Sequence, residues 1–424
     1  MPQTGSPIRV AHDISFLGTF FRHTSAQSGV YRVVEQLLLA LCARDDLELT
    51  AVAICGKDPI NDVTSAWQYF AGKEFQRGKF DPVLDGWLSR QYVRLLRNGI
   101  PKVLNYRQLL TRVIRKADSP RPLLDANRYD VFHSPFFPLP SRDFMPAVPR
   151  VITIYDLIAC RRPDWMPQEI VQLMQRILLS IDPERDWVTC ISEYTKQDFC
   201  EYTGMSPDRV FVTPLAAADH FRPVEDPALI DVVRKKYGIP DGDYFLSLGA
   251  LQPRKNFTQV IKSFLQLIKQ QPTPDLNLVV VGEKAWMYDE LLSSTTNVAE
   301  LRDRLIFTGF IDDDDLSAVY SGARAFVFVS LFEGFGLPVL EAMQCGTPVI
   351  ASNVTAVPEV VGDAGLLVDP YDTDALSNAM LLVLQDEQRA LELKKRGFRR
   401  SSEFSWSACA ERTMNAYRAA TQST

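Results

Sequence analysis

At 424 residues the chain is too long for one hydrophobic core of ordinary size, so we expect two domains. Hydrophobic residues make up 46% and charged residues 23%, a balance typical of soluble globular proteins. The net charge of -6 argues against a dedicated nucleic-acid-binding protein, and no apolar run reaches the roughly 18 residues of a membrane-spanning helix.

Cysteine and histidine usage gives no indication of a metal centre. The seven cysteines form no CxxC pair, and the four histidines (His12, His23, His133 and His220) do not have the spacing of metal ligands. The odd cysteine count predicts reduced thiols. The start of the chain, "MPQTGSPIRVAHDIS", has no basic stretch before an apolar core, so no signal peptide is expected. We therefore expect a cytoplasmic protein, either free or at the inner face of the cell membrane.

Short apolar runs alternate with longer amphipathic stretches through the first half of the chain. Residues 29–43 have the apolar spacing of a helix. Five runs rich in Val and Ile are expected to form buried strands: 8–15, 47–55, 129–134, 150–156 and 186–192. Because the runs are continuously apolar, they predict a parallel sheet covered on both faces.

The segment 57–128 interrupts this alternation. Its part from 86 to 128 contains ten Arg or Lys residues and two Asp, interleaved with Trp, Tyr, Leu and Ile as in an amphipathic helix. One interpretation is an insertion that contacts anionic membrane lipids through residues 86–117. The other is a helical hairpin that packs on the first domain and leaves its arginines in solvent.

A Pro- and Ala-rich stretch around 214–240 is typical of a linker, and a second α/β series follows it. Six runs are expected to form strands: 244–250, 276–282, 305–309, 323–330, 347–352 and 365–369. Helical patterns separate them, at 257–270, 313–322 and 372–385. We predict an α/β fold of two doubly wound, Rossmann-like domains that face each other across a cleft. The expected parts are domains at 1–218 and 219–403 and a final amphipathic helix within 404–424.

Two glutamates, Glu333 and Glu341, stand eight positions apart around a glycine turn in "EGFGLPVLE". Pro338 suits the first turn of a helix, so free N–H groups near Gly336 and Leu337 are expected at a helix start that binds phosphate. Carboxylates accept hydrogen bonds from hydroxyl groups. A diphosphate at the helix start would thus leave room for a sugar on one side and a ribose on the other.

A second motif, "LGALQPRKNF", supplies positive charge. A strand is expected to end at Gly249, and the loop after it carries Arg254 and Lys255. Ligands of α/β sheets bind beyond the carboxyl ends of the strands, where two cations would neutralise a departing diphosphate. Each charged residue alone would more often lie on the surface, and the combination favours a binding site.

Together these motifs resemble retaining glycosyltransferases of the family 4 type, which have the GT-B fold, and in particular their mannosyltransferase-like group. The resemblance is specific over residues 205–420 and weaker before them, where "SGVYRV" (28–33) and "VFHSPF" (131–136) are its anchors. Four segments carry it: "LGALQPRKN" (248–256), "FTGFIDDDDLSAVYSGA" (307–323), "FEGFGLPVLEAMQCGTPVIAS" (332–352) with the E-x7-E element of the family, and "PEVVGDAGLLVDP" (358–370).

The resemblance implies that the second domain binds a nucleotide-sugar and the first domain an acceptor. Glu333 would bind hydroxyls of the transferred sugar, Glu341 would hold the ribose, and Arg254 and Lys255 would grip the diphosphate. Backbone and side chains near the phosphates and the base would complete the donor site: Gly249, Phe310, Ile311, Gly334, Phe335, Gly336 and Leu337.

From the first domain, the resemblance implies that a loop at Gly29 closes over the phosphates. It also implies that His133 faces the sugar near the reacting carbon, which makes it a catalytic candidate beside Glu333, Arg254 and Lys255. Relatives often have an arginine where this chain has Ala250, so Arg254 and Lys255 would carry more of the phosphate binding. The final helix would cross back onto the first domain.

The implied activity is metal-independent transfer of a hexose from a UDP- or GDP-sugar, with retention, to a glycan or lipid-linked acceptor in polysaccharide or lipopolysaccharide biosynthesis. No metal or other cofactor is expected. One alternative is a nucleotide-sugar isomerase or epimerase of the same fold, although the first half shows no paired acid and base. The other is a non-catalytic sugar-nucleotide-binding partner, against which the intact charged motifs argue.

Overall fold

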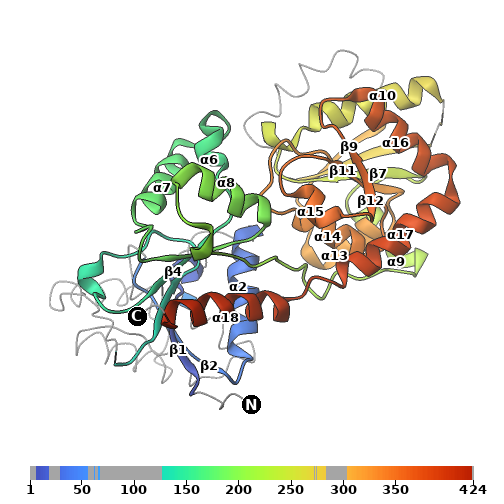
Figure 1. Cartoon of the computed structure of the whole chain (residues 1–424). Coiled ribbons are helices and arrows are strands. Elements are labelled where there is room, and N and C mark those ends of the chain that lie inside the picture. The colour runs from blue at the N-terminus through green and yellow to red at the C-terminus, as the bar shows by residue number, and fades with distance from the viewer. Residues whose placement is uncertain are drawn as a thin grey trace, which may run out of the picture.

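The parts of the chain that the computed structural model describes are residues 6–18, 29–55, 62, 65–66, 127–271, 273, 275–282 and 303–422. They form two lobes, each built around a six-stranded parallel sheet with helices on its faces (Figure 1). The candidate membrane segment 86–117 lies outside the described residues. No helix in the described part combines the length and the apolar composition needed to cross a bilayer.

The first sheet, in what we call the N-lobe, has the strand order β2-β1-β3-β4-β5-β6. Its strands are β1 (Ile8–Asp13), β2 (Leu47–Val52), β3 (Val131–Ser134), β4 (Arg150–Ile154), β5 (Trp187–Cys190) and β6 (Val210–Val212). Its longer helices are α2 (Gly29–Cys42), α7 (Gln168–Leu179) and α8 (Glu193–Thr203), and α6 (Ile158–Arg161) is a single turn. The short edge strand β6 and helices α6 to α8 were not indicated by the sequence pattern.

The second sheet, in the C-lobe, has the strand order β12-β11-β10-β7-β8-β9. Its strands are β7 (Tyr244–Leu248), β8 (Asn277–Val281), β9 (Leu305–Gly309), β10 (Ala325–Phe328), β11 (Val349–Ser352) and β12 (Gly365–Val368). Its helices are α9 (Pro227–Lys236), α10 (Phe257–Gln270), α13 (Asp313–Ser321), α14 (Leu337–Gln344), α15 (Val357–Val361), α16 (Thr373–Gln385) and α17 (Glu387–Ser401).

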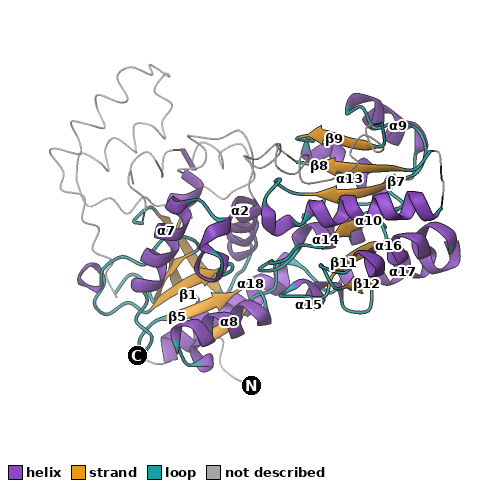
Figure 2. Ribbon diagram, turned by 90° about the horizontal axis from the view of Figure 1, so that it is seen from above, coloured by secondary structure: helices purple, strands orange, loops and turns teal. Residues whose placement is uncertain are grey.

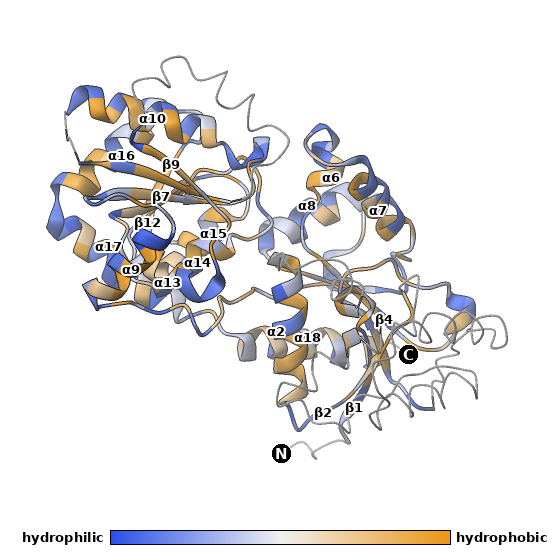
Figure 3. Ribbon diagram, turned by 180° about the vertical axis from the view of Figure 1, so that it is seen from behind, coloured by the Kyte–Doolittle hydropathy of each residue, from blue (hydrophilic) through white to orange (hydrophobic). Residues whose placement is uncertain are grey.

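Alternation along the strands fills a core on each face of the C-lobe sheet. Phe245 packs in the core that contains residues of α10 and α16, whereas its neighbours Tyr244 and Leu246 pack in the core that contains residues of α13 and α14. Figure 2 shows helices on both sides of this sheet. Apolar and polar bands alternate along α10 in Figure 3, as expected of a helix with one face on a sheet.

The last helix, α18 (Trp406–Gln422), leaves the C-lobe and packs on the N-lobe, against α2 and strands β4 to β6 (Figure 1). Its buried residues include Cys409, Met414 and Tyr417. The chain therefore crosses between the lobes twice, once before α9 and once before α18.

One expectation for the connection is wrong in part. Residues 214–240 were expected to form a linker, but 227–236 within them form helix α9. Asp226 accepts a hydrogen bond from the backbone N–H of Ala228, and Pro227 occupies the first turn. Both are ordinary signals of a helix start. Because Pro and Ala also dominate linkers, composition alone did not distinguish the two.

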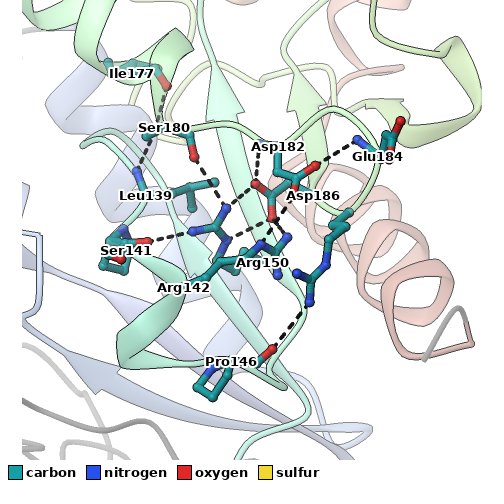
Figure 4. Close-up of polar contacts among 12 residues, drawn as sticks. Leu139, Ser141, Arg142, Pro146, Arg150, Ile177, Ser180, Asp182, Glu184 and Asp186 are labelled. Carbon is teal, nitrogen blue, oxygen red and sulfur yellow. Dashed lines mark hydrogen bonds and ion pairs between the residues drawn. The ribbon is translucent and has the colours of Figure 1, made fainter.

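A buried ion pair lies at the amino ends of β4 and β5, at the edge of the N-lobe sheet opposite to the carboxyl ends of its strands (Figure 4). Arg150 donates to Asp186 through Nε (2.8 Å) and Nη2 (2.5 Å), and Arg142 donates to the same carboxylate (2.5 Å). The backbone N–H of Asp182 adds a further bond to it (2.7 Å). Asp186 is fully buried. Through these hydrogen bonds the cluster joins β4, β5 and the loops before them.

Candidate active site

The two charged motifs meet at the carboxyl edge of the C-lobe sheet. Strands β7 and β10 are parallel neighbours, so the loops that follow them start at the same edge. The backbone N–H of Leu331, after β10, donates to the carbonyl of Arg254, after β7 (2.7 Å). Both segments singled out in the sequence therefore lie together at this edge, and we use the word crevice below for the proposed donor site between these loops and the N-lobe.

Glu333 receives one cation on each carboxylate oxygen. Arg254 Nη1 lies 3.0 Å from Oε2, and Lys255 Nζ lies 2.6 Å from Oε1. Burial acts to raise the pKa of Glu333, but the charges of Lys255 and Arg254 hold it below its ordinary value. Burial also lowers the pKa of Lys255 to about 8, against the opposing effect of Glu333. The cluster thus pairs an ionised carboxylate with a lysine that titrates near physiological pH.

Gly249 makes room for the lysine side chain. Its φ of 148° is one that side-chain-bearing residues rarely adopt, and a Cβ atom there would lie 3.1 Å from Cε of Lys255. The ammonium group then lies 4.8 Å from the centroid of the Phe328 ring. Asn256, which sequence reasoning gave no role, fixes the loop by donating to the carbonyls of Val329 (3.1 Å) and Pro370 (2.7 Å).

Helix α14 begins directly after the glycine turn. Gly336 has φ 123° at the N-cap, no side chain caps the helix, and a proline lies in the first turn. The start of α14 therefore has the character of an anion site, with Leu337 as its first residue. Phe335 is buried and packs edge-to-face on Phe404, so its side chain holds the turn in place.

The glycine turn also touches the N-lobe. A Cβ atom on Gly334 would lie 2.0 Å from the carbonyl oxygen of Tyr155, so only glycine fits between the lobes here. The hydroxyl of Thr195 lies 3.2 Å from the Gly334 carbonyl and 3.3 Å from that of Tyr155. Asp156, the next residue, interacts with Arg254 and Glu333, and burial raises its pKa.

Glu341, about one turn into α14, also faces the N-lobe. The hydroxyl of Tyr320 donates to its Oε2 (2.9 Å), and Arg32 of α2 approaches its Oε1 (3.5 Å). Arg32 forms a closer pair with Asp313 (2.5 Å). Burial raises the pKa of Glu341, and Arg32 and Tyr320 act against this shift. Lys255 also interacts electrostatically with Glu341, which links the two ends of the crevice.

The remaining predicted residues lie in different surroundings. Gly29 is the first residue of α2, and a Cβ atom there would have no described atom within 4 Å. The loop before it, residues 19–28, lies outside the described residues. Phe310 follows β9 with 51% of its surface exposed, whereas Ile311 is 1% exposed and packs in the core. Of these two side chains, only that of Phe310 is exposed.

His133 does not face the crevice, contrary to the expectation. It is fully buried, with Nδ1 2.6 Å from the hydroxyl of Tyr417 in α18 and Nε2 2.9 Å from that of Thr153. The ring of His12 packs edge-on against it, and burial holds the pKa of His133 well below its ordinary value. With both ring nitrogens bonded inside the N-lobe, the histidine fixes α18 on the sheet.

Glu359 joins the lobes at a third point that sequence reasoning did not identify. Its carboxylate, on α15 of the C-lobe, accepts hydrogen bonds from the backbone N–H groups of Glu193 (2.8 Å) and Tyr194 (2.5 Å). These groups open helix α8 of the N-lobe, where the helix dipole favours a negative charge. The only sequence signal was its position in the "PEVVGDAG" motif. Among the described residues, no group of three or more His, Cys, Asp or Glu side chains is arranged to hold a metal ion.

Two facing Rossmann-like domains, with a final helix that returns to the first, have the architecture of the GT-B fold. The family described as "Glycosyl transferases group 1" matches residues 230–400. O-antigen chain mannosyltransferase B of Escherichia coli is 34% identical over 288 residues, which cover 68% of this chain and 74% of the relative. The chain belongs to the group 1 glycosyltransferases, and the predicted fold class and enzyme class are confirmed.

Two further comparisons extend this result. The GDP-mannose-dependent alpha-(1-6)-phosphatidylinositol monomannoside mannosyltransferase of Mycolicibacterium smegmatis is 31% identical over 222 residues, which cover 50% of this chain and 56% of the relative. The crystal structure of Alr3699/HepE of Anabaena in complex with UDP and glucose superposes with a TM-score of 0.63 and 15% identity. It covers 96% of this chain and 98% of the other. At that identity the likeness shows the fold alone.

Proposed function

We propose that the protein transfers mannose from GDP-mannose to a glycan or lipid-linked acceptor. The alternative donor is a UDP-sugar. The product would belong to polysaccharide or lipopolysaccharide biosynthesis. The observation that carries the proposal is the cluster of Arg254, Lys255 and Glu333 beside the start of α14. The names of two relatives at 31% and 34% identity support mannose, and one of them supports GDP.

Donor binding exchanges the partners within this cluster. In the structure, Glu333 forms an ion pair with each of the two cations, and its single negative charge leaves an excess of positive charge. A diphosphate at the start of α14 would draw Arg254 and Lys255 toward its oxygens, because it offers them more negative charge than one carboxylate. Glu333 is then free to accept hydrogen bonds from hydroxyls of the sugar, while Glu341 holds the ribose.

The same cations assist departure of the diphosphate. As the bond between the anomeric carbon and the phosphate oxygen breaks, its electron pair passes to the phosphate, and Arg254, Lys255 and the helix start stabilise the charge. The acceptor hydroxyl attacks the anomeric carbon from the same face and passes its proton to the departing phosphate, so the configuration is retained. With two side-chain cations in this role, we propose that transfer needs no metal ion.

Release of free nucleotide, measured with and without acceptor, tests the proposal. We expect GDP-mannose to give release that a mannose-containing glycan or lipid-linked glycan stimulates, and EDTA to leave the rate unchanged. A new nucleotide-sugar formed without acceptor would instead establish the isomerase alternative. Binding without turnover would establish the non-catalytic one. Loss of the rate in EDTA would contradict the metal-free mechanism alone.

A lipid-linked acceptor would explain the basic insertion. Residues 86–117 would hold the protein at the inner membrane face if the acceptor is carried on a lipid. Sedimentation with vesicles of neutral lipid and of anionic lipid tests this part separately. Binding to the anionic vesicles that falls as salt rises is the expected result, and equal sedimentation with both would contradict it.

A further inference from the structure

Arg32 reaches from the N-lobe to the nucleoside end of the crevice. It lies in the first turn of α2, and its guanidinium lies between Asp313 (2.5 Å) and Glu341 (3.5 Å), both of the C-lobe. Its Nε is buried and has no hydrogen-bond partner among the described residues. A buried donor without a partner is costly. The Arg32 side chain as a whole keeps 22% of its surface exposed, so a ligand in the proposed donor site can reach the guanidinium and supply an acceptor.

Glu341 has an acceptor oxygen that no close donor occupies among the described residues. Its Oε2 accepts a hydrogen bond from Tyr320 at 2.9 Å, whereas its Oε1 has, in the described part of the chain, only the long contact with Arg32. A separation of 3.5 Å is at the limit of a hydrogen bond, so a closer donor would be preferred there. A hydroxyl group both donates and accepts. One hydroxyl can therefore donate to Glu341 and accept from Arg32 at the same time.

We propose that Arg32 is a donor-binding residue that recognises the ribose together with Glu341, while Asp313 holds the outer edge of its guanidinium. This inference rests on the proposed function, because it takes Glu341 as the ribose-binding residue. It adds a specificity, for ribonucleotides over nucleotides that lack the ribose hydroxyls. Because Arg32 and Glu341 belong to different lobes, ribose binding also favours the closed arrangement of the lobes.

Calorimetry with the full chain tests the inference, using GDP, UDP, their 2′,3′-dideoxy analogues and inorganic pyrophosphate as probes. Arg32→Ala is expected to weaken binding of the preferred ribonucleotide about tenfold, as loss of a charged hydrogen bond would. It should leave the dideoxy analogue and pyrophosphate nearly unchanged, so the preference for ribose falls by about the same factor. Glu341→Ala should lose the same preference.

Two control variants distinguish ribose recognition by Arg32 from an ion pair that only connects the lobes. Arg44→Ala removes an N-lobe arginine whose partners, Asp46 and Glu411, are remote from Glu341 and should change nothing. Asp313→Asn weakens the ion pair but keeps Arg32, so the ribose preference should persist.

If Arg32→Ala weakened binding of the ribonucleotide and of its dideoxy analogue equally, Arg32 would only connect the two lobes, and the inference would be overturned. No change in either affinity would overturn it as well. Either result leaves the proposed function standing. Failure of the unmodified protein to bind any nucleoside diphosphate would overturn both.

Discussion

Two ion-pair clusters in this enzyme, one around the buried Asp186 and one around the partly buried Glu333, lie at opposite ends of their sheets and differ in how fully they are bonded. At the amino ends of the N-lobe strands, Asp186 accepts four hydrogen bonds, and Arg150 also donates to the carbonyls of Pro140 (2.6 Å) and Ser180 (3.4 Å). Beyond the carboxyl ends of the C-lobe strands, Lys255 donates one bond to a side chain of the described residues, although an ammonium group has three donors.

We propose that the difference separates a structural cluster from a functional one. A buried charge is stable only when its bonds are satisfied, and the Arg150–Asp186 pair meets that condition with protein groups alone. Lys255 does not, and burial lowers its pKa to about 8. Spare donors beside an anion site at a helix start are what a diphosphate would complete. The predictions below test this distinction.

The largest effect is expected from Glu333→Gln, which removes the charge of the functional cluster but keeps its shape. Transfer should fall about 100-fold or more, because the sugar loses a charged acceptor that acts at the reacting end of the donor. Affinity for GDP should be retained, since both cations remain. Steady-state transfer and calorimetry measure the two quantities.

Glu392→Gln is the matched control for this substitution, because it makes the same change in an ion pair on the surface of α17. Its transfer rate should equal that of the unmodified enzyme. If Glu333→Gln also transferred at the full rate, the cluster would have no catalytic role.

Asp186→Asn should have the opposite profile. Removing one partner of a saturated buried pair leaves Arg150 uncompensated and should lower the free energy of unfolding by about 3 kcal/mol. The molecules that stay folded should transfer at the normal rate. Urea denaturation and activity per folded molecule measure these outcomes, and Asp164→Asn, which breaks an exposed pair with Arg162, is the control. A normal urea midpoint would contradict a structural role for the cluster.

Much of this arrangement was predictable from local sequence, and the exceptions depend on distant segments. The apolar runs predicted most strands, and the helix at 257–270 coincides with α10. Glu333, Arg254 and Lys255 were predicted to meet because they follow strands of one parallel sheet. The role of Arg32 was not predictable, since its partners lie about 300 residues further along the chain.

His133 shows a second kind of limit. Its position at the end of a strand was correctly identified, but neighbouring residues of a strand point to opposite faces. Helix α18, from the other end of the chain, covers the face on which His133 lies and supplies the hydroxyl of Tyr417. Local sequence carries no information on such a partner.

The next largest effect concerns pH. Burial lowers the pKa of Lys255 to about 8, whereas a bound diphosphate would favour its charged form. Above pH 8, binding must therefore take up a proton, and affinity for GDP should fall up to about tenfold per pH unit. Calorimetry in two buffers of different ionisation enthalpy measures the uptake. Lys255→Arg, which stays charged, should remove the pH dependence in this window, and a persistent fall would assign it to another group.

The smallest effect is expected from Glu359→Gln, at the contact of α15 with the start of α8. This carboxylate shares a feature with each cluster, because protein groups bond it, as they do Asp186, and because it lies between the lobes, as Glu333 does. The two N–H groups donate to different oxygens of the carboxylate, and an amide keeps only one acceptor oxygen. One hydrogen bond and the attraction of the charge to the helix dipole are therefore lost, together about 1 kcal/mol. Closure of the lobes should become less favourable, which raises KM for the donor about fivefold and leaves kcat unchanged. A fall in kcat with unchanged KM would place Glu359 in the chemical step rather than in closure.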